Sequence, residues 1–260
     1  MSDAATRKKE GRTKQLRSGS ARTPRHLGGT AGVASPSEPS RRRAGGGGRR
    51  VLALIGVVGP FCYFVLVTVL GLLWEGYDPI RDTQSELAAV DSPYRLLMNV
   101  AGFMGMGVSI LAFSAAYHLL LRRSLAKALA TSLLVLGGVF MVVVGFFPCD
   151  AGCVDVTQTS RLHSIFSMPG AIGLPAAAMI SALVFRRDGR FSTAWQVSSF
   201  WLGLVSLASG PIIAVQLVEG VNGLLQRAAM WTALAWMMAV SIKLYSLARP
   251  RSEPDRQAAG

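Results

Sequence analysis

The sequence has little charge outside its first fifty residues. Charged side chains make up only 16% of the 260 residues, well below the roughly 25% usual for soluble domains. The mean hydropathy is +0.39. Apolar runs of at least about 18 residues indicate transmembrane helices, and several occur. This composition favours an integral membrane protein and excludes an ordinary soluble enzyme.

Histidine is scarce, and the usual catalytic motifs are absent. A catalytic zinc ion takes three protein ligands, but His26, His118 and His163 fall in the tail and at opposite ends of the predicted bundle. Carboxylates bind calcium, yet no EF-hand spacing occurs. The sequence also lacks glycine motifs for phosphates or dinucleotides and the G-x-S-x-G elbow. We therefore expect no metal and no cofactor.

Cysteine occurs only three times. Cys62 lies inside the first apolar run and is expected to be a small core residue. Cys149 and Cys153 share a short loop, and they are candidates for a disulfide if that loop faces an oxidising compartment. A single C-x3-C pair lacks the ligands for a structural zinc site.

Six apolar segments dominate the chain beyond residue 50. Each is long enough, at about 1.5 Å per residue, to cross about 30 Å of hydrocarbon as a helix. An open strand would leave backbone groups unpaired in lipid. The predicted fold is therefore all-α, a polytopic bundle of six transmembrane helices. The segments are residues 51–73, 95–121, 127–147, 161–185, 194–217 and 224–247.

The first fifty residues have a different composition. They hold 13 basic and three acidic residues among many glycines, serines and prolines, so they lack the apolar side chains for a core. The predicted organisation is a disordered basic tail over residues 1–50, a six-helix domain over 51–247 and a short tail over 248–260. We favour a tail that acts as a topology determinant and solvated spacer. The alternative is a tail that binds anionic lipid head groups, whereas its lack of aromatic residues argues against nucleic acid.

Charge alternates between successive loops and predicts the orientation. Basic residues concentrate in the N-terminal tail, at 122–127, at 186–190 and after residue 248. Positive loops remain cytoplasmic, so both termini are predicted to be cytoplasmic in a multi-pass plasma-membrane protein. The other three loops hold most of the acids, namely Glu75, Asp78, Asp82, Glu86, Asp91, Asp150, Asp155 and Glu219.

Small residues and prolines give hints about helix packing. Gly173, Ala177 and Ser181 recur at four-residue spacing, which lets helix backbones approach closely in lipid. Pro169 and Pro175 in the fourth segment, and Pro211 in the fifth, predict bends there, because proline removes an intrahelical hydrogen bond.

Polar groups gather at the predicted outer face. Arg95, Arg161 and Arg227 are expected to pair with carboxylates there, and Ser85 is expected to cap a short helix. One interpretation is a polar pocket in which His163 and a carboxylate bind or transfer protons. The other, which we favour, is that these groups cap helices in water, since outer loops are polar in any membrane protein. The candidate cluster is Tyr77, Asp78, Ser85, Glu86, Arg95, Asn99, Asp150, His163 and Arg227.

Several short motifs in topological order resemble one known family. They are Gly59-Pro60, Tyr77-Asp78-Pro79, Ser85-Glu86-Leu87, glycines 102, 105 and 107, Phe147-Pro148-Cys149-Asp150, and His163. Over residues 51–247 the chain resembles the bacterial membrane proteins grouped as domain of unknown function 998, which are similar to Frag1/DRAM-like proteins. The resemblance implies a six-helix bundle and carries over no catalytic residue. Cys149, Cys153 and the basic tail look like departures from the usual pattern of that family.

Three hypotheses about function follow. The leading one is a non-enzymatic membrane protein whose polar extracytoplasmic cap contacts a ligand or lipid. The second is a membrane-embedded enzyme that acts on lipid or envelope substrates through His163 and a nearby carboxylate. The third is a small-solute transporter, which is disfavoured because the middles of the spans carry essentially no charge. The expected partner is the lipid bilayer, and nothing in the sequence indicates an oligomeric state.

Overall fold

The computed structural model describes residues 39–214 and 220–249, and every regular element in these ranges is helical. Residues 1–38, 215–219 and 250–260, which include the predicted site of Glu219 and most of both tails, lie outside the described ranges. Two short 3-10 helices, η1 (Gln84–Ala88) and η3 (Ala151–Cys153), lie in loops. The long helices are α1 (Pro39–Leu73), a continuous helix made of α2 (Arg95–Leu97), η2 (Met98–Met104) and α3 (Gly105–Leu120), then α4 (Leu125–Val144), α5 (Gln158–Arg186), α6 (Thr193–Ala214) and α7 (Asn222–Leu247).

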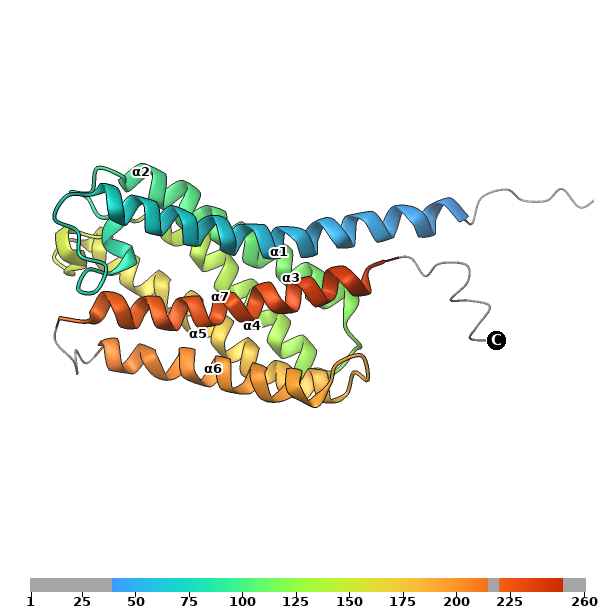
Figure 1. The fold of residues 1–260 in the computed structure, drawn as a ribbon. Helices are drawn as coiled ribbons and strands as arrows, with labels where there is room; N and C mark the ends of the chain where they lie inside the picture. Colours follow the sequence, from blue (N-terminus) through green and yellow to red (C-terminus); the bar gives the residue numbers. More distant parts are fainter. Residues whose placement is uncertain (1–38, 215–219, 250–260) are drawn as a thin grey trace, which may run out of the picture. The chain divides into compact units, whose positions relative to one another are not determined.

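The long helices lie side by side as one bundle (Figure 1), and their contacts close a ring in chain order. Each packs against the next along the chain, and α7 closes the ring against α1. Helix α7 also touches α3 and α5 across the bundle. The side chain of Arg50, in the first half of α1, donates a 3.1 Å hydrogen bond to Tyr245 Oη near the end of α7. The end of α7 therefore lies beside α1 at Arg50.

Five of the described helices are long and apolar enough to cross a membrane. They are Gly47–Leu73 within α1, the continuous helix Arg95–Leu120, α4, α5 and α7. The described part of α6 ends at Ala214, before the end of the predicted span at residue 217, and it is not among the five. The chain is thus an all-α, multi-pass membrane protein.

Neighbouring helices approach closely at glycines. A methyl group added at Gly173 of α5 would lie 2.7 Å from the backbone oxygen of Leu133 on α4. One added at Gly107 of α3 would lie 2.7 Å from the backbone oxygen of Gly138 on α4. In lipid, where apolar side chains gain nothing by leaving the solvent, such close packing is a main source of helix association. The predicted packing role of Gly173 is confirmed.

Two features of the helices differ from expectation. Helix α1 begins at Pro39, inside the segment predicted to be disordered. Helix α5 contains Pro169 and Pro175 within one continuous helix, and the bend predicted there stays a prediction. Cys62 is exposed rather than buried, because α1 turns Tyr63, Val67 and Leu70 inward, and the side chain of Cys62 points away from them. The side chain of Pro211 is not described, so the bend predicted at this residue in α6 stays a prediction.

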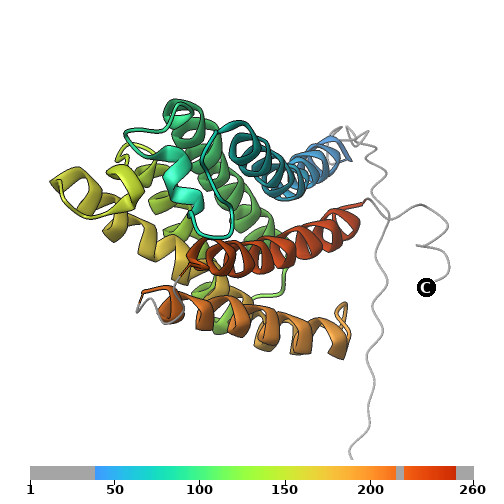
Figure 2. The same cartoon turned by 60° about the vertical axis from the view of Figure 1, so that its left-hand side comes forward.

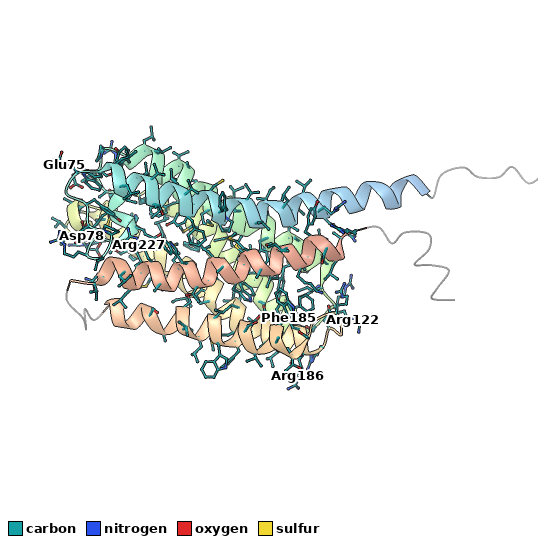
Figure 3. The ribbon with its side chains drawn as sticks, in the orientation of Figure 1. Glu75, Asp78, Arg122, Phe185, Arg186 and Arg227 are labelled. Carbon is teal, nitrogen blue, oxygen red and sulfur yellow. A yellow bond between two sulfur atoms is a disulfide. The ribbon has the colours of Figure 1, made fainter. Side chains whose placement is uncertain are left out.

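The two ends of the described bundle carry opposite charge. Figure 3 places Glu75, Asp78 and Arg227 at one end, and Arg122 and Arg186 at the other. Among the residues whose side chains are described, the first end holds seven acids and four arginines, and the second holds ten basic residues and one acid. That single acid, Asp188, is buried and accepts two hydrogen bonds from the Arg190 guanidinium at 2.6 and 2.8 Å. We refer below to the acidic end and the basic end.

Candidate functional site

At the acidic end, the loop between α1 and α2 folds over the first turn of α7. We call residues 77–87 the cap. The backbone N–H of Gly223 donates to the Arg81 oxygen at 3.0 Å, and that of Leu224 donates to the Ile80 oxygen at 2.9 Å. The first N–H groups of a helix have no partner within it, so the cap satisfies them. Figure 2 shows this loop reaching the start of α7.

Arg227 fixes the cap from below. Its Nη1 donates to the backbone oxygens of Pro79 at 2.5 Å and of Asp82 at 2.9 Å, and its Nη2 donates to Tyr77 Oη. The side chain is only 6% exposed. The predicted pairing of Arg227 with a carboxylate is therefore wrong. The backbone carbonyl groups of the cap point toward α7. They accept the hydrogen bonds of the Arg227 guanidinium in place of a carboxylate.

Tyr77 links the cap to Trp74, the residue that follows α1. Its hydroxyl donates to the Thr83 oxygen at 2.8 Å, and its ring stacks on Trp74 with centroids 5.6 Å apart. Burial raises the pKa of the Tyr77 hydroxyl, although the nearby Arg227 guanidinium acts in the opposite direction. The phenol is therefore neutral at physiological pH and serves as a structural bridge.

The carboxylates of the cap accept hydrogen bonds from backbone N–H groups of the cap itself. Glu86 Oε1 accepts from Thr83 N at 2.8 Å and from Thr83 Oγ1 at 3.0 Å. Thr83, rather than the predicted Ser85, therefore occupies the capping position of η1. Burial raises the pKa of the Glu86 carboxyl, and the hydrogen bonds from Thr83 only partly offset this. Asp78 Oδ1 accepts from Ile80 N at 2.9 Å, and Asp78 Oδ2 lies 3.1 Å from the Nε of Arg81.

The residue that follows the cap, Ala88, is tied to the start of the second long helix. Asn99 Nδ2 donates to the Ala88 oxygen at 2.9 Å and to the Arg95 oxygen at 2.8 Å. Asn99 lies in the π-helical segment η2, where the wider backbone turn is a feature that sequence patterns do not indicate. The Arg95 side chain is exposed and has no ion-pair partner among the described residues, which contradicts its predicted pairing.

The loop between α4 and α5 completes the acidic end. Val90 N donates to the Cys149 oxygen at 2.9 Å, and a disulfide joins Cys149 to Cys153. Asp150 Oδ2 accepts from Thr157 N at 2.7 Å, immediately before α5 begins. This backbone hydrogen bond from Thr157, together with bonds from the Thr157 hydroxyl and from Val156 N, lowers the pKa of the Asp150 carboxyl. Asp150 is thus used to shape the loop.

His163 is buried in α5 and 3% exposed. Its Nδ1 lies 2.7 Å from the Phe147 oxygen, and its ring lies 5.8 Å from that of Phe103. Its Nε2 has no hydrogen-bond partner in the described parts of the chain. Within those same parts, no hydrogen bond or ion pair joins His163 to a carboxylate.

A cavity of about 140 Å³ lies inside the bundle beneath the cap. Gln84 and Ser85 of η1 form its wall on the cap side, and α7 contributes Gln226 and Met230. Most of the remaining wall is apolar, with side chains from all six long helices, including Tyr63, Phe103, Met106, Ile110, Met141, Val144, Leu174, Ser206 and Leu234. No charged residue lines it among the described residues.

The structure thus divides the predicted cluster. Tyr77, Asp78, Glu86 and Arg227 meet in the cap, whereas Asn99, Asp150 and His163 serve the neighbouring loop and helix ends. Ser85 borders the cavity. Sequence analysis missed Gln84 and Gln226. The only available signal was an uncharged amide in the loop after the first apolar segment and another at the start of the sixth. Over the described residues, no group of three histidines, cysteines or acids could hold a metal ion.

Residues 57–243 match the model of a protein family described as "Protein of unknown function (DUF998)". The match covers all the described spans except the first residues of α1 and the last residues of α7. No curated protein matches the chain, and no solved structure matches it.

Replacing Arg227 by methionine should loosen the cap. The substitution keeps the apolar stem but leaves the Pro79 and Asp82 oxygens without their charged donor. Hydrogen bonds to charged groups contribute about 1.5–3 kcal/mol each, so we expect a loss of about 3 kcal/mol in stability. Thermal unfolding in lipid nanodiscs measures the loss, and proteolysis within residues 77–87 should accelerate. Arg95→Met is the matched control, because the Arg95 side chain is exposed. Equal stability of the two variants would refute this role of Arg227.

Backbone amides just before α5 should lose their protection from hydrogen exchange in acid. A carboxyl with a lowered pKa in the folded state stabilises the fold above its unfolded pKa, and this stabilisation is lost as pH falls through the folded value. We therefore expect amide exchange at Val156 and Thr157, corrected for intrinsic rates, to rise as Asp150 becomes protonated. Asp150→Asn should abolish this pH dependence, and Asp91→Asn should preserve it. An unchanged profile in Asp150→Asn would contradict the assignment.

Proposed function

Because the chain belongs to the DUF998 family of proteins of unknown function, the site itself must suggest a role, and we propose a non-enzymatic, six-span cell-membrane protein whose extracytoplasmic cap closes over a ligand-binding cavity. The observation that carries this proposal is the apolar cavity directly beneath η1. Ligand sites are typically concave and mostly apolar, with a few polar groups that orient the ligand.

The orientation within the proposal rests on the charge difference between the two ends. The basic end would face the cytoplasm, together with both termini, because basic loops are retained on that side. The acidic end, with the cap and the disulfide, would then face an oxidising exterior. The basic N-terminal tail would meet anionic head groups of the inner leaflet. Helix α6 would provide the sixth span, since α5 and α7 both pack against it.

The enzyme alternative has less support. An acid/base pair requires hydrogen-bond contact, directly or through one water, and the described contacts of His163 include no carboxylate. The cap carboxylates instead hold backbone groups. A small-solute transporter would need polar or ionisable groups along the spans, whereas the cavity wall is largely apolar and uncharged.

Cysteine accessibility tests the orientation. In a Cys62→Ala background, Ile80→Cys introduces a thiol at an exposed cap residue, and Gly189→Cys introduces one in the exposed loop at the basic end. In intact cells, a membrane-impermeant maleimide should label Ile80→Cys but should label Gly189→Cys only after permeabilisation. Cys149 and Cys153 should react only after reduction. The reverse pattern, with Gly189→Cys labelled in intact cells, would overturn the orientation.

Binding of an apolar probe tests the cavity. We expect toluene to bind saturably to the protein in nanodiscs, and Ala233→Phe, which fills the cavity from α7, to abolish binding. Ala228→Phe places the same ring on an exposed position of the same helix and is the matched control. Ligand-observed NMR measures both. If Ala233→Phe binds toluene as well as Ala228→Phe does, the cavity is not the binding site.

A further inference from the structure

The side chain of Gln84 is the unusual polar group of the cavity. It is 1% exposed and lines the cavity from η1. Neither its Nε2 nor its Oε1 has a hydrogen-bond partner in residues 39–214 and 220–249. Burying an unpaired polar group is costly, and nearly all such groups in native proteins have a partner in the protein, a water or a ligand.

The backbone around Gln84 fixes its position. Gln84 N donates a 2.6 Å hydrogen bond to Oε1 of Gln226 on α7. The adjacent Thr83 is held by Glu86, and Leu87 is fully buried. The residue therefore cannot swing toward water without breaking the contact between η1 and α7. Its amide remains in the wall of the cavity, with one donor group and one acceptor available.

Three other polar side chains of the wall donate to protein partners. Ser206 Oγ donates to the Ala229 oxygen at 2.7 Å, and Ser167 Oγ donates to the His163 oxygen at 2.7 Å. Tyr63 Oη donates to the Met230 sulfur at 3.4 Å. Ser85 and Gln226 lie beside Gln84 on the cap side of the cavity. Polar recognition in the cavity thus concentrates at this end, around the unpaired Gln84 amide, and the remainder of the wall offers apolar contact.

Size and charge restrict the occupant. An apolar cavity of about 150 Å³ holds one benzene molecule, and this cavity measures about 140 Å³. With no charged residue on the described wall, an ion would be buried without a counter-charge, at high cost. Met106, Met141 and Met230 line the cavity, and methionine sulfur makes favourable contacts with aromatic rings. A cluster of waters would find few hydrogen-bond partners on so apolar a wall.

We propose that the cavity binds a small uncharged molecule with a benzene-sized apolar body and one hydroxyl group, which hydrogen-bonds to the Gln84 amide. A hydroxyl both accepts from Nε2 and donates to Oε1, so it complements the group that the protein leaves unpaired. This inference rests on the proposed ligand-binding role of the cavity and adds the chemistry of the ligand.

Methionine-methyl NMR tests the inference on the full-length protein in lipid nanodiscs. Benzyl alcohol, toluene and benzoate are titrated, with each concentration expressed as that in the bilayer. Met106, Met141 and Met230 report on the cavity, and Met168, which is 61% exposed on the outside of α5, reports simple partitioning into lipid. We expect saturable shifts at the three cavity methionines and about tenfold tighter binding of benzyl alcohol than of toluene, as one good hydrogen bond would give. Benzoate should not bind.

Gln84→Leu separates recognition from folding. This variant should still bind toluene but lose the preference for benzyl alcohol, while Gln196→Leu, the same substitution away from the cavity, should keep it. Equal binding of toluene and benzyl alcohol by the wild type, a preference unchanged in Gln84→Leu, or binding of benzoate would overturn the proposed ligand chemistry and leave the ligand-binding cavity intact. Shifts at Met168 alone, with no saturable binding of any probe, would overturn both.

Discussion

The acidic end of this protein depends on one contact, between the Arg227 guanidinium and the carbonyl groups of the loop above it. A helix N-terminus presents unpaired N–H groups, and a loop that reverses direction presents unpaired carbonyls. Here each satisfies the other, and Arg227 supplies further donors where the loop turns back toward α7. Gly223 permits this contact, because a methyl group there would lie 2.7 Å from the Pro79 oxygen and closer still to that of Asp82.

This contact has a consequence for the interior. By fixing the loop on α7, it brings η1 over the centre of the ring of helices, where close packing at glycines draws neighbouring backbones together but leaves a cavity under the cap. Most ionisable groups of the cap form hydrogen bonds or ion pairs within the loop. The cap is therefore a structural cover for the cavity rather than a reactive surface. The chemistry available to a ligand lies beneath it, in an uncharged and mostly apolar space with an unpaired amide at its upper end.

Much of the fold could be predicted from the sequence, because the length of an apolar segment and the charge of a loop are properties of a few consecutive residues. The apolar segments predicted all six long helices, and loop composition predicted an acidic and a basic end. The site was less accessible. A sequence shows that Arg227 needs partners but not that backbone carbonyls provide them, since carbonyls belong to every residue. The π-helical turn at Asn99, the outward side of Cys62 and the cavity at Gln84 all depend on how helices rotate and pack in three dimensions, and residue type alone does not specify this.

Hydrogen exchange at the start of α7 tests the central contact most directly. The amides of Gly223 and Leu224 belong to the first turn of the helix, so no carbonyl within α7 can protect them. If the cap covers the helix in the membrane-embedded wild type, both amides should exchange slowly, with protection similar to that of the Glu86 amide, which bonds to Thr83 within the cap. Exchange of Gly223 and Leu224 at the rate of an open helix end, while the middle of α7 remains protected, would show that the cap does not rest on α7 and would contradict the account.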